Sequence, residues 1–314
     1  MTRAFGFPGQ GSQVIGMGKA LAEAYPTARA VFEEVDESLG QKLSNLMFEG
    51  DQDVLTLTEN AQPALMAVSI AAMRVLSEQA GRSLPEMASF VAGHSLGEYS
   101  ALAAAGAISV SDTARLLRRR GQAMQPAVPV GVRARATLLG LDLPEAQEVA
   151  AEAAIYGVCA AANDNAPGQV VVSGHRAAVE GAVALAAERG AKRSVMLPVS
   201  APFHCPLMSP AAEAMAEALA MVAIIPPSVP LIANVIAGPV TDPDSIRRLL
   251  VEQVTGAVRW RESVLFMRDN GVRELVEIGA GKVLSALTRR IDRGLKACSV
   301  HTPQDVDDML GRLN

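Results

Sequence analysis

The chain has 314 residues, 50% of them hydrophobic, and at roughly 150 residues per domain this length favours about two globular units. A net charge of −5 and an aromatic content of 4% argue against a nucleic-acid partner, because the sequence has neither a basic field nor many rings on which bases could stack. The three cysteines, Cys159, Cys205 and Cys298, form neither a disulfide framework nor a Cys/His cluster, so no metal is expected.

Short apolar runs alternate with longer amphipathic stretches, a pattern typical of an α/β protein with a mostly parallel sheet. Strands are predicted over 3–7, 89–92, 229–234 and 273–278. Helices are predicted over 61–79, 96–106, 111–124, 210–222, 244–254, 261–270 and 282–291. Ser111, Asp112 and Thr113 are the candidate capping residues of the helix over 111–124.

The segment 128–198 has a different order of elements. Strand 136–141, helix 144–154 and strand 158–162 are followed, after a turn over 163–168, by strand 169–173, helix 176–189 and strand 193–198. This βαββαβ order is that of the ferredoxin-like fold, which closes on itself. We therefore expect a small ferredoxin-like domain at 128–198, inserted into a large α/β catalytic domain made of 1–127 and 199–314.

No segment has the sequence pattern of a membrane span or a secretion signal. The longest uncharged run, 218–241, is long enough to cross a bilayer, but prolines and turn residues interrupt it. The apolar stretch at the N-terminus is too short for a signal peptide. The chain is therefore expected to be cytoplasmic and to have no membrane partner.

The strongest local signal is Gly93-His94-Ser95-Leu96-Gly97, which lies between a predicted strand and an alanine-rich helix. This is the nucleophile-elbow pattern, in which a sharp turn exposes a serine hydroxyl at the edge of a sheet. Both glycines are needed because side chains there would collide with backbone, and the start of the helix points N–H groups at a developing oxyanion. An ordinary glycine-rich turn is the alternative, but the flanking elements favour a nucleophilic Ser95.

A nucleophilic serine needs a base, and the chain has four histidines. His94 adjoins the serine and is expected to point away from it, His175 begins a predicted helix, and His301 lies near the C-terminus. His204 remains, in a proline-rich loop that follows the small domain, and it is the candidate base; a packed loop histidine is the alternative. No acid is evident as a third member, and a backbone carbonyl is able to orient the imidazole instead.

Arg120 is expected on the apolar side of its helix, because it shares a face with Leu116, Leu117 and Met124. A cation in such a place is costly unless an anion meets it. From periodicity alone, that anion is either an internal carboxylate or a substrate carboxylate held through two parallel hydrogen bonds.

Two glycine-rich loops do not fit nucleotide-binding motifs. The loop over 9–13 is followed by Val14 where the dinucleotide fingerprint has its third glycine, and the loop over 279–283 lacks the Ser/Thr after the P-loop lysine. The backbone N–H of Gln10 is still able to lie beside Ser95, where an oxyanion hole takes a donor from a separate loop.

Together these motifs resemble those of the malonyl-CoA:acyl carrier protein transacylases, over nearly the whole chain. The residues that carry the resemblance are Phe7-Pro8-Gly9-Gln10-Gly11-Ser12-Gln13, Gly93-His94-Ser95-Leu96-Gly97-Glu98-Tyr99, Arg120-Gly121, the run 163–168, Phe203-His204, Gln253 and Glu277-Ile278-Gly279. The resemblance implies an α/β-hydrolase-like core with an inserted ferredoxin-like subdomain, which agrees with the predicted order of elements.

The resemblance also implies a role for each residue of a site: Ser95 as nucleophile, His204 as its base, Gln10 and Leu96 as backbone donors of the oxyanion hole, Arg120 as the clamp for the malonyl carboxylate, and Gln253 as the carbonyl that orients His204. Phe203, directly before His204, resembles the malonyl-selective form of that loop.

The implied activity is an S-malonyltransferase of fatty acid synthesis. It transfers the malonyl group from malonyl-CoA to the phosphopantetheine thiol of holo acyl carrier protein, through a malonyl-serine intermediate, in two ping-pong steps. The CoA thioester is a substrate, so no bound cofactor is implied, and the chain is expected to act as a monomer.

One departure from the family pattern lies at the start of the small domain. Where the family usually has small residues and a methionine, this chain has Arg133 and Arg135, which alternate onto one side of a predicted strand. They are expected to form a solvated edge, with a landing site for an acidic carrier protein as the alternative.

Two alternative functions are consistent with some of the same sequence motifs. A serine hydrolase, such as a thioesterase or lipase, shares the elbow, but no acid stands in the triad position and an arginine is expected to face the site. A non-catalytic scaffold subunit is disfavoured because Ser95, His204 and Arg120 are all present.

Overall fold

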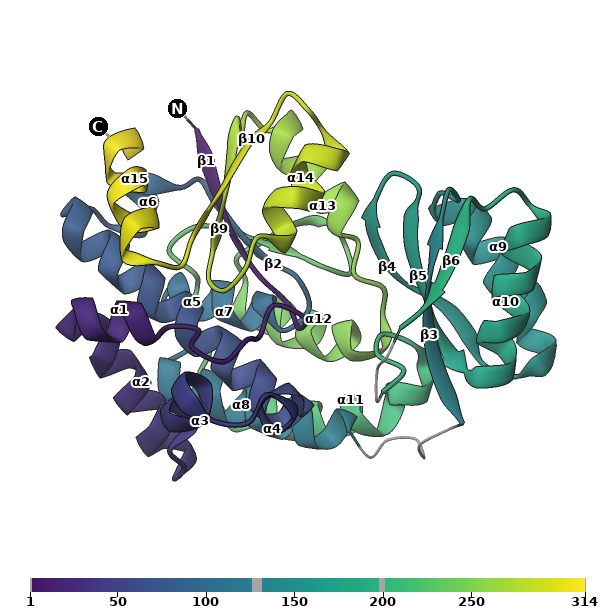
Figure 1. The fold of residues 1–314 in the computed structure, drawn as a ribbon, viewed down its shortest axis with the longest axis horizontal. Helices are drawn as coiled ribbons and strands as arrows, with labels where there is room; N and C mark the ends of the chain where they lie inside the picture. Colours follow the sequence, from purple (N-terminus) through teal and green to yellow (C-terminus); the bar gives the residue numbers. More distant parts are fainter. Residues whose placement is uncertain (1, 126–131, 198–200, 314) are drawn as a thin grey trace.

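The computed structural model describes residues 2–125, 132–197 and 201–313, which fold around two sheets (Figure 1). The larger sheet has the strand order β10-β9-β1-β2-β7-β8, and all its neighbours are parallel except β7 and β8. Its strands are β1 (Arg3–Phe7), β2 (Phe90–Gly93), β7 (Leu231–Ala233), β8 (Gly238–Val240), β9 (Glu274–Ile278) and β10 (Lys296–Val300). The α/β class with a mostly parallel sheet is as predicted.

Both faces of this sheet are buried, as parallel strands require. Along β1, Phe5 and Phe7 belong to the core that includes α5, whereas Ala4 packs in a second core with Trp260 of α13. The helices of this part of the chain are α1 (Lys19–Ala24), α2 (Pro26–Leu39), α3 (Leu43–Glu49), α4 (Gln52–Thr56), α5 (Thr58–Ala80), α6 (Leu84–Met87), α7 (Gly97–Ala104), α8 (Val110–Met124), α11 (Ser209–Ala220), α12 (Pro243–Thr255), α13 (Trp260–Asp269), α14 (Val283–Ile291) and α15 (Pro303–Leu313).

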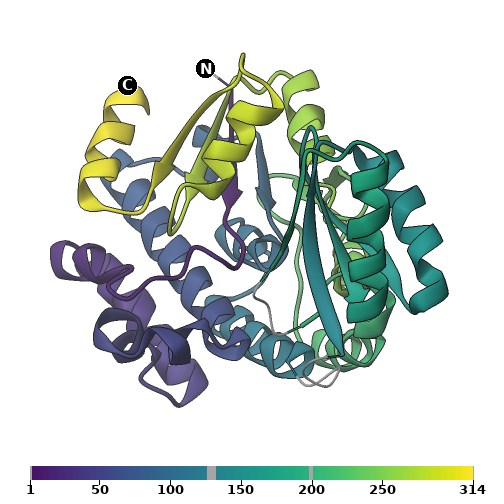
Figure 2. The same cartoon turned by 45° about the vertical axis from the view of Figure 1, so that its right-hand side comes forward.

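The smaller sheet is antiparallel, with the order β4-β5-β3-β6, and has its own core (Figures 1 and 2). Its elements are β3 (Arg133–Leu139), α9 (Leu143–Ala153), β4 (Cys159–Ala166), β5 (Gln169–His175), α10 (Arg176–Glu188) and β6 (Arg193–Met196). Val149 of α9 and Val179 of α10 pack with Val172 of β5 in that core. The predicted ferredoxin-like βαββαβ order is therefore present.

The predicted domain limits stay a prediction. The junctions at 127/128 and 198/199 lie outside the described residues. In Figure 2 the small sheet and its two helices stand beside the large sheet.

Some expectations about single elements were wrong. The segment 163–168 is not a turn throughout, because β4 continues to Ala166 through two irregularities in its pairing with β5. Ser109, two positions before the first predicted candidate, caps α8: its hydroxyl accepts a hydrogen bond from Asp112 N. Within the described part of the chain, no helix combines the length and apolar character that crossing a bilayer requires.

Candidate active site

A sharp turn between β2 and α7 carries Ser95, whose φ of 56° is in the left-handed region that few non-glycine residues adopt. A Cβ on Gly93 would lie 1.9 Å from the carbonyl carbon of Gly97. A Cβ on Gly97 would lie 2.1 Å from the carbonyl oxygen of Phe7. Both glycines are therefore required by the close approach of three backbone segments, for the reason that the sequence pattern suggested.

Ser95 and His204 lie within hydrogen-bonding distance although 109 positions separate them: the Ser95 hydroxyl and Nε2 of His204 are 2.8 Å apart. His204 has a φ of 60° and is 2% exposed. Its Nδ1–H donates to the backbone carbonyl of Gln253 at 2.8 Å, which leaves Nε2 with a free lone pair toward the serine. The imidazole is thus oriented by a carbonyl and not by a carboxylate.

The guanidinium of Arg120 is the third group at this point, and it is 1% exposed. Nη2 donates to the Ser95 hydroxyl at 3.1 Å and to Oε1 of Gln253 at 2.9 Å, and Nη1 donates to Oε1 of Gln62 at 2.8 Å. Among the residues that the structure describes, Arg120 forms no ion pair. The carboxyl group that acts on it electrostatically is that of Glu98, which is linked to it through the Gln253 amide and does not contact it directly. No carboxylate of the described chain therefore occupies the guanidinium directly, which favours a substrate carboxylate as its partner.

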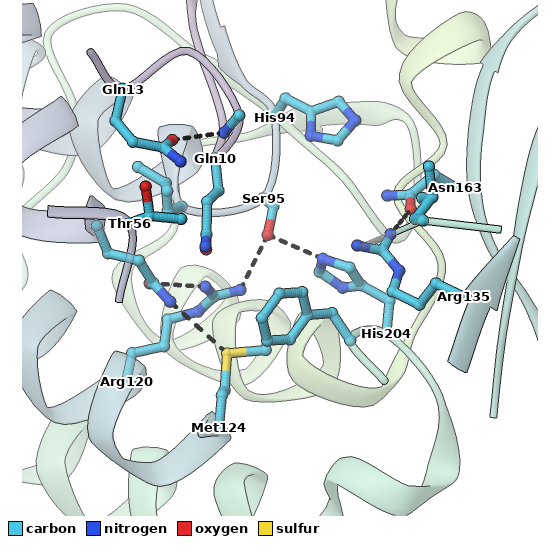
Figure 3. Close-up of a pocket in the computed structure, with 15 residues that line it drawn as sticks. Gln10, Gln13, Thr56, His94, Ser95, Arg120, Met124, Arg135, Asn163 and His204 are labelled. Atoms are coloured by element: carbon cyan, nitrogen blue, oxygen red, sulfur yellow. Dashed lines mark hydrogen bonds between the residues drawn. The ribbon is translucent and has the colours of Figure 1, made fainter. Parts of the chain in front are cut away.

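The two other predicted donors lie in the same cavity. Gln10 and Leu96 line a cavity of about 470 Å³ together with Ser95, His204 and Arg120 (Figure 3). On the elbow, the N–H of Ser95 donates to Oδ1 of Asn234 at 2.9 Å. The position of Leu96 N, on the following residue at the start of α7, suits a donor aimed at the serine.

Two buried amide side chains and one carboxyl group form a hydrogen-bond network with the backbone of the elbow. Asn234 donates from Nδ2 to the Gly93 carbonyl at 2.7 Å, and its own N–H donates to Oε2 of Glu98 at 3.0 Å. Nε2 of Gln253 donates to the same Glu98 oxygen at 2.8 Å. Sequence reasoning missed Asn234 and Gln62, and gave Glu98 no role; an asparagine at the end of a buried strand was the only local signal.

Burial and charge change the pKa values of two of these groups. The pKa of His204 lies well below its usual 6.5, because the imidazole is buried and the cations Arg120 and Arg135 disfavour its protonation. Burial raises the pKa of Glu98 to about 7, against the opposing effect of its hydrogen bonds. A neutral imidazole at neutral pH is the form that can accept a proton from the serine.

The three other histidines make no hydrogen bond to the Ser95 hydroxyl among the described residues. His94 lines the cavity but turns its ring away from Ser95, and its Nε2 meets Oδ1 of Asn165 at 2.9 Å (Figure 3). His175 stands at the start of α10 and His301 forms a pair with Asp305. These placements agree with the elimination that left His204.

The expectation for Arg133 and Arg135 was wrong. Arg133 is buried, with 4% of its surface exposed, and Arg135 lines the cavity that contains Ser95. The reason is that this end of β3 packs against the rest of the protein: Arg133 donates to the backbone carbonyl of Gln125, which follows α8, and Arg135 shares its cavity with Ser95 and Arg120. Neither side chain forms the solvated edge that alternation along a strand suggested.

Comparison with known proteins agrees with this geometry. The acyl transferase domain family matches residues 4–312. The malonyl CoA-acyl carrier protein transacylase of Bacillus subtilis (strain 168) is 47% identical over 305 residues, which cover 97% of this chain and 95% of that protein. This chain belongs to the acyl transferase family.

Solved structures of family members superpose closely on this acyl transferase. The acyl-carrier-protein-S-malonyltransferase of Bartonella henselae matches with a TM-score of 0.97 and 57% identity, over 100% of this chain and 99% of that one. A malonyl-transacylase in complex with a type II PKS acyl-carrier protein matches with a TM-score of 0.95 and 40% identity, over 99% of this chain and 100% of that one.

For this acyl transferase, the polar groups in the cavity suit an acyl group. Within the described ranges, no group of three or more His, Cys, Asp or Glu side chains is placed to hold a metal. A hydroxyl, an imidazole and a buried guanidinium converge instead. By their chemistry these groups are able to serve as a nucleophile, a base and a carboxylate-binding group.

Proposed function

We propose that this acyl transferase moves a malonyl group from malonyl-CoA to the phosphopantetheine thiol of holo acyl carrier protein, through an ester on Ser95. Its product supplies extender units for fatty acid synthesis, and its place of action is the cytoplasm. The observation that carries the proposal is the convergence, in one cavity, of Ser95, His204 and Arg120, whose guanidinium has no direct ion pair among the described residues. The names of the relatives support the choice of malonyl over other acyl groups.

In the first half-reaction, the Ser95 hydroxyl attacks the thioester carbonyl carbon while Nε2 of His204 takes its proton. The N–H groups of Gln10 and Leu96 donate to the oxyanion of the tetrahedral intermediate, an effect of about 10²–10³-fold for each donor. The carbon–sulfur bond then breaks, and His204 gives its proton to the CoA sulfur. A malonyl ester remains on Ser95.

In the second half-reaction, the thiol of the carrier attacks this ester and His204 takes the thiol proton. When the ester bond breaks, the proton returns to Ser95 and malonyl carrier protein leaves. The same imidazole serves both directions, and such a base contributes about 10²–10⁴-fold. No other bound group is needed, because the CoA thioester already activates the acyl carbon.

Arg120 gives the site its preference for a diacid. The guanidinium already lies 3.1 Å from the Ser95 hydroxyl, so a carboxylate on the acyl group reaches it when the carbonyl carbon reaches the serine. Acetyl-CoA leaves this buried cation without an anion, and that penalty disfavours acetyl transfer.

A measurement of CoA release separates this function from the rival hydrolase. With malonyl-CoA alone, we expect a burst of about one CoA per enzyme and then a slow rate, with continuous release once holo carrier protein is added. Continuous release that ignores the carrier would instead identify a thioesterase. The Gln253 carbonyl on His204, in place of an acid, supports the first outcome.

A further inference from the structure

The cavity contains a second guanidinium that the proposed mechanism does not use. Arg135 projects from β3 into the cavity, and Nη2 donates to Oδ1 of Asn163. Its guanidinium carbon lies 5.5 Å from the centroid of the Phe203 ring. Among the residues that the structure describes, its Nε meets no hydrogen-bond partner.

No anion balances this cation within the described chain. Arg135 forms no ion pair with any residue in the ranges that the structure covers. Burial lowers its pKa only to about 10, so the guanidinium is charged at neutral pH. Its neighbours, an amide and an aromatic ring, are neutral. The one hydrogen bond that the described residues give it uses Nη2, and the residue lines the cavity.

The arrangement of the four substituents around the reacting carbon decides which part of the substrate lies near Arg135. The tetrahedral intermediate has four substituents, and three of them are placed by Ser95, by the oxyanion donors and by Arg120. The fourth is the sulfur, which must lie within reach of Nε2 of His204 to receive its proton. Arg120 and Arg135 lie on opposite sides of the Ser95–His204 pair (Figure 3).

We propose that Arg135 binds the pantetheine arm of the thioester, by donating to the carbonyl of the amide nearest the sulfur. Two methylene groups and a nitrogen separate this carbonyl from the sulfur. The acyl group extends from the reacting carbon toward Arg120, so the arm extends to the opposite side of the Ser95–His204 pair, where Arg135 lies (Figure 3). Asn163 and Phe203 hold the guanidinium in place from both sides. The inference rests on the proposed function and adds a specificity-determining residue to it.

The arm is common to both substrates, so one residue serves both half-reactions. CoA brings the arm in with the malonyl group, and holo carrier protein brings the same arm with the accepting thiol. A neutral carbonyl suits this position because a charge-assisted hydrogen bond gains stability without the desolvation of a second charged group.

Two malonyl thioesters of matched length test the contact. Malonyl-N-acetylcysteamine retains the amide nearest the sulfur, and the S-pentyl malonyl thioester replaces it with methylenes. The rate of malonyl gain on Ser95, followed by quenched-flow intact mass, is measured for both thioesters with the wild type, Arg135→Met, Arg135→Lys and Arg133→Met. Arg133→Met is the matched control, because Arg133 lies on the same strand and does not line the cavity.

The wild type is expected to prefer the amide thioester, and Arg135→Met to reduce this preference by about 10- to 100-fold, the range for a hydrogen bond to a charged group. Arg135→Lys retains part of the preference, and Arg133→Met retains it in full. Any effect of Arg135 on the pKa of His204 changes both thioesters alike and cancels in the ratio. Deacylation by N-acetylcysteamine and by pentanethiol is expected to show the same change.

An equal preference in the wild type and Arg135→Met would overturn the inference, as would a wild type with no preference for the amide. Failure of the proposed function has a different signature: no malonyl thioester, with or without the amide, then modifies Ser95 in the wild type.

Discussion

At the scale of single residues, the site depends on three side chains that lie far apart in the sequence. Ser95 was predictable because the elbow is a local motif, and His204 because only four histidines had to be compared. The role of Gln253 came from family resemblance alone, since nothing local marks a carbonyl as the partner of an imidazole. Gln62 had no signal, because its contact with Arg120 joins helices 58 positions apart.

Replacing Arg120 with alanine is expected to relax selectivity. The ratio of kcat/KM for malonyl-CoA to that for acetyl-CoA should fall by about 10- to 100-fold, since the charge-assisted contact with the carboxylate is lost. Ser95 should still be acylated by acetyl-CoA. Arg119→Ala is the matched control, because Arg119 lies next to Arg120 on α8 and is exposed. An unchanged ratio in Arg120→Ala would show that another group binds the carboxylate.

The pH dependence of acylation reports on His204. Its pKa is lowered well below 6.5 by burial and by the charges of Arg120 and Arg135, so the required neutral form is present throughout the neutral range. The rate should stay level as the pH falls to 6.5 and drop only when the pH passes through the lowered pKa. Arg120→Ala removes one of those charges and should shift this drop to higher pH. A wild-type drop centred above 6.5 would contradict the assignment.

At the scale of elements, the elbow is held by close backbone packing and by a buried polar network. Four strands of the large sheet and most of its long helices were predicted from the sequence pattern, whereas the strands β8 and β10 were missed. The helices α1, α3, α4 and α6 have only 4 to 7 residues each and are too short to show a period. The longer α2 and α15 were missed although each begins with a proline, Pro26 and Pro303, which is a usable start signal.

Gly97→Ala should disturb the elbow. The new methyl group would lie 2.1 Å from the Phe7 carbonyl oxygen, so backbone must move, at a cost of about 1–3 kcal/mol or more in the free energy of unfolding. Acylation of Ser95 should fall with it. Gly311→Ala in α15 is the control: its methyl group meets no neighbour within 4 Å, and it should stabilise the protein by about 0.5–1 kcal/mol. Denaturant unfolding and acylation rates check both variants, and a Gly97→Ala enzyme with normal stability and rate would refute the packing argument.

Because burial raises the pKa of Glu98, the free energy of unfolding should decrease as the pH rises. Its pKa is about 7 in the folded protein and near 4.5 when exposed, so the folded state favours the neutral carboxyl group. As the pH rises from 4.5 toward 7, wild-type stability should therefore fall relative to Glu98→Gln, by about 3 kcal/mol in total, and level off above that range. Urea unfolding of both proteins at several pH values measures this difference. A difference that stays constant across this range would show that Glu98 is ionised in the folded state.

At the scale of the whole molecule, the mostly parallel sheet positions Ser95, and the small antiparallel sheet supplies part of the opposite wall of the cavity. The fold class was predictable because each strand or helix is indicated by a local sequence pattern, and the order of these elements along the chain is typical of an α/β protein. The position of Arg135 was not predictable in this way. Alternation along β3 places it on a face of the small sheet, but only the docking of the two sheets decides that it lines the cavity with Ser95.

The most direct test of the account is the mass that the intact protein gains after brief exposure to a panel of acyl-CoAs. We expect one malonyl group on the wild type, located on the peptide that contains Ser95, little acetyl, and no adduct on Ser95→Ala that has first been shown to fold by circular dichroism. A malonyl adduct that persists in Ser95→Ala, or an acetyl adduct that forms as readily as the malonyl one, would contradict it.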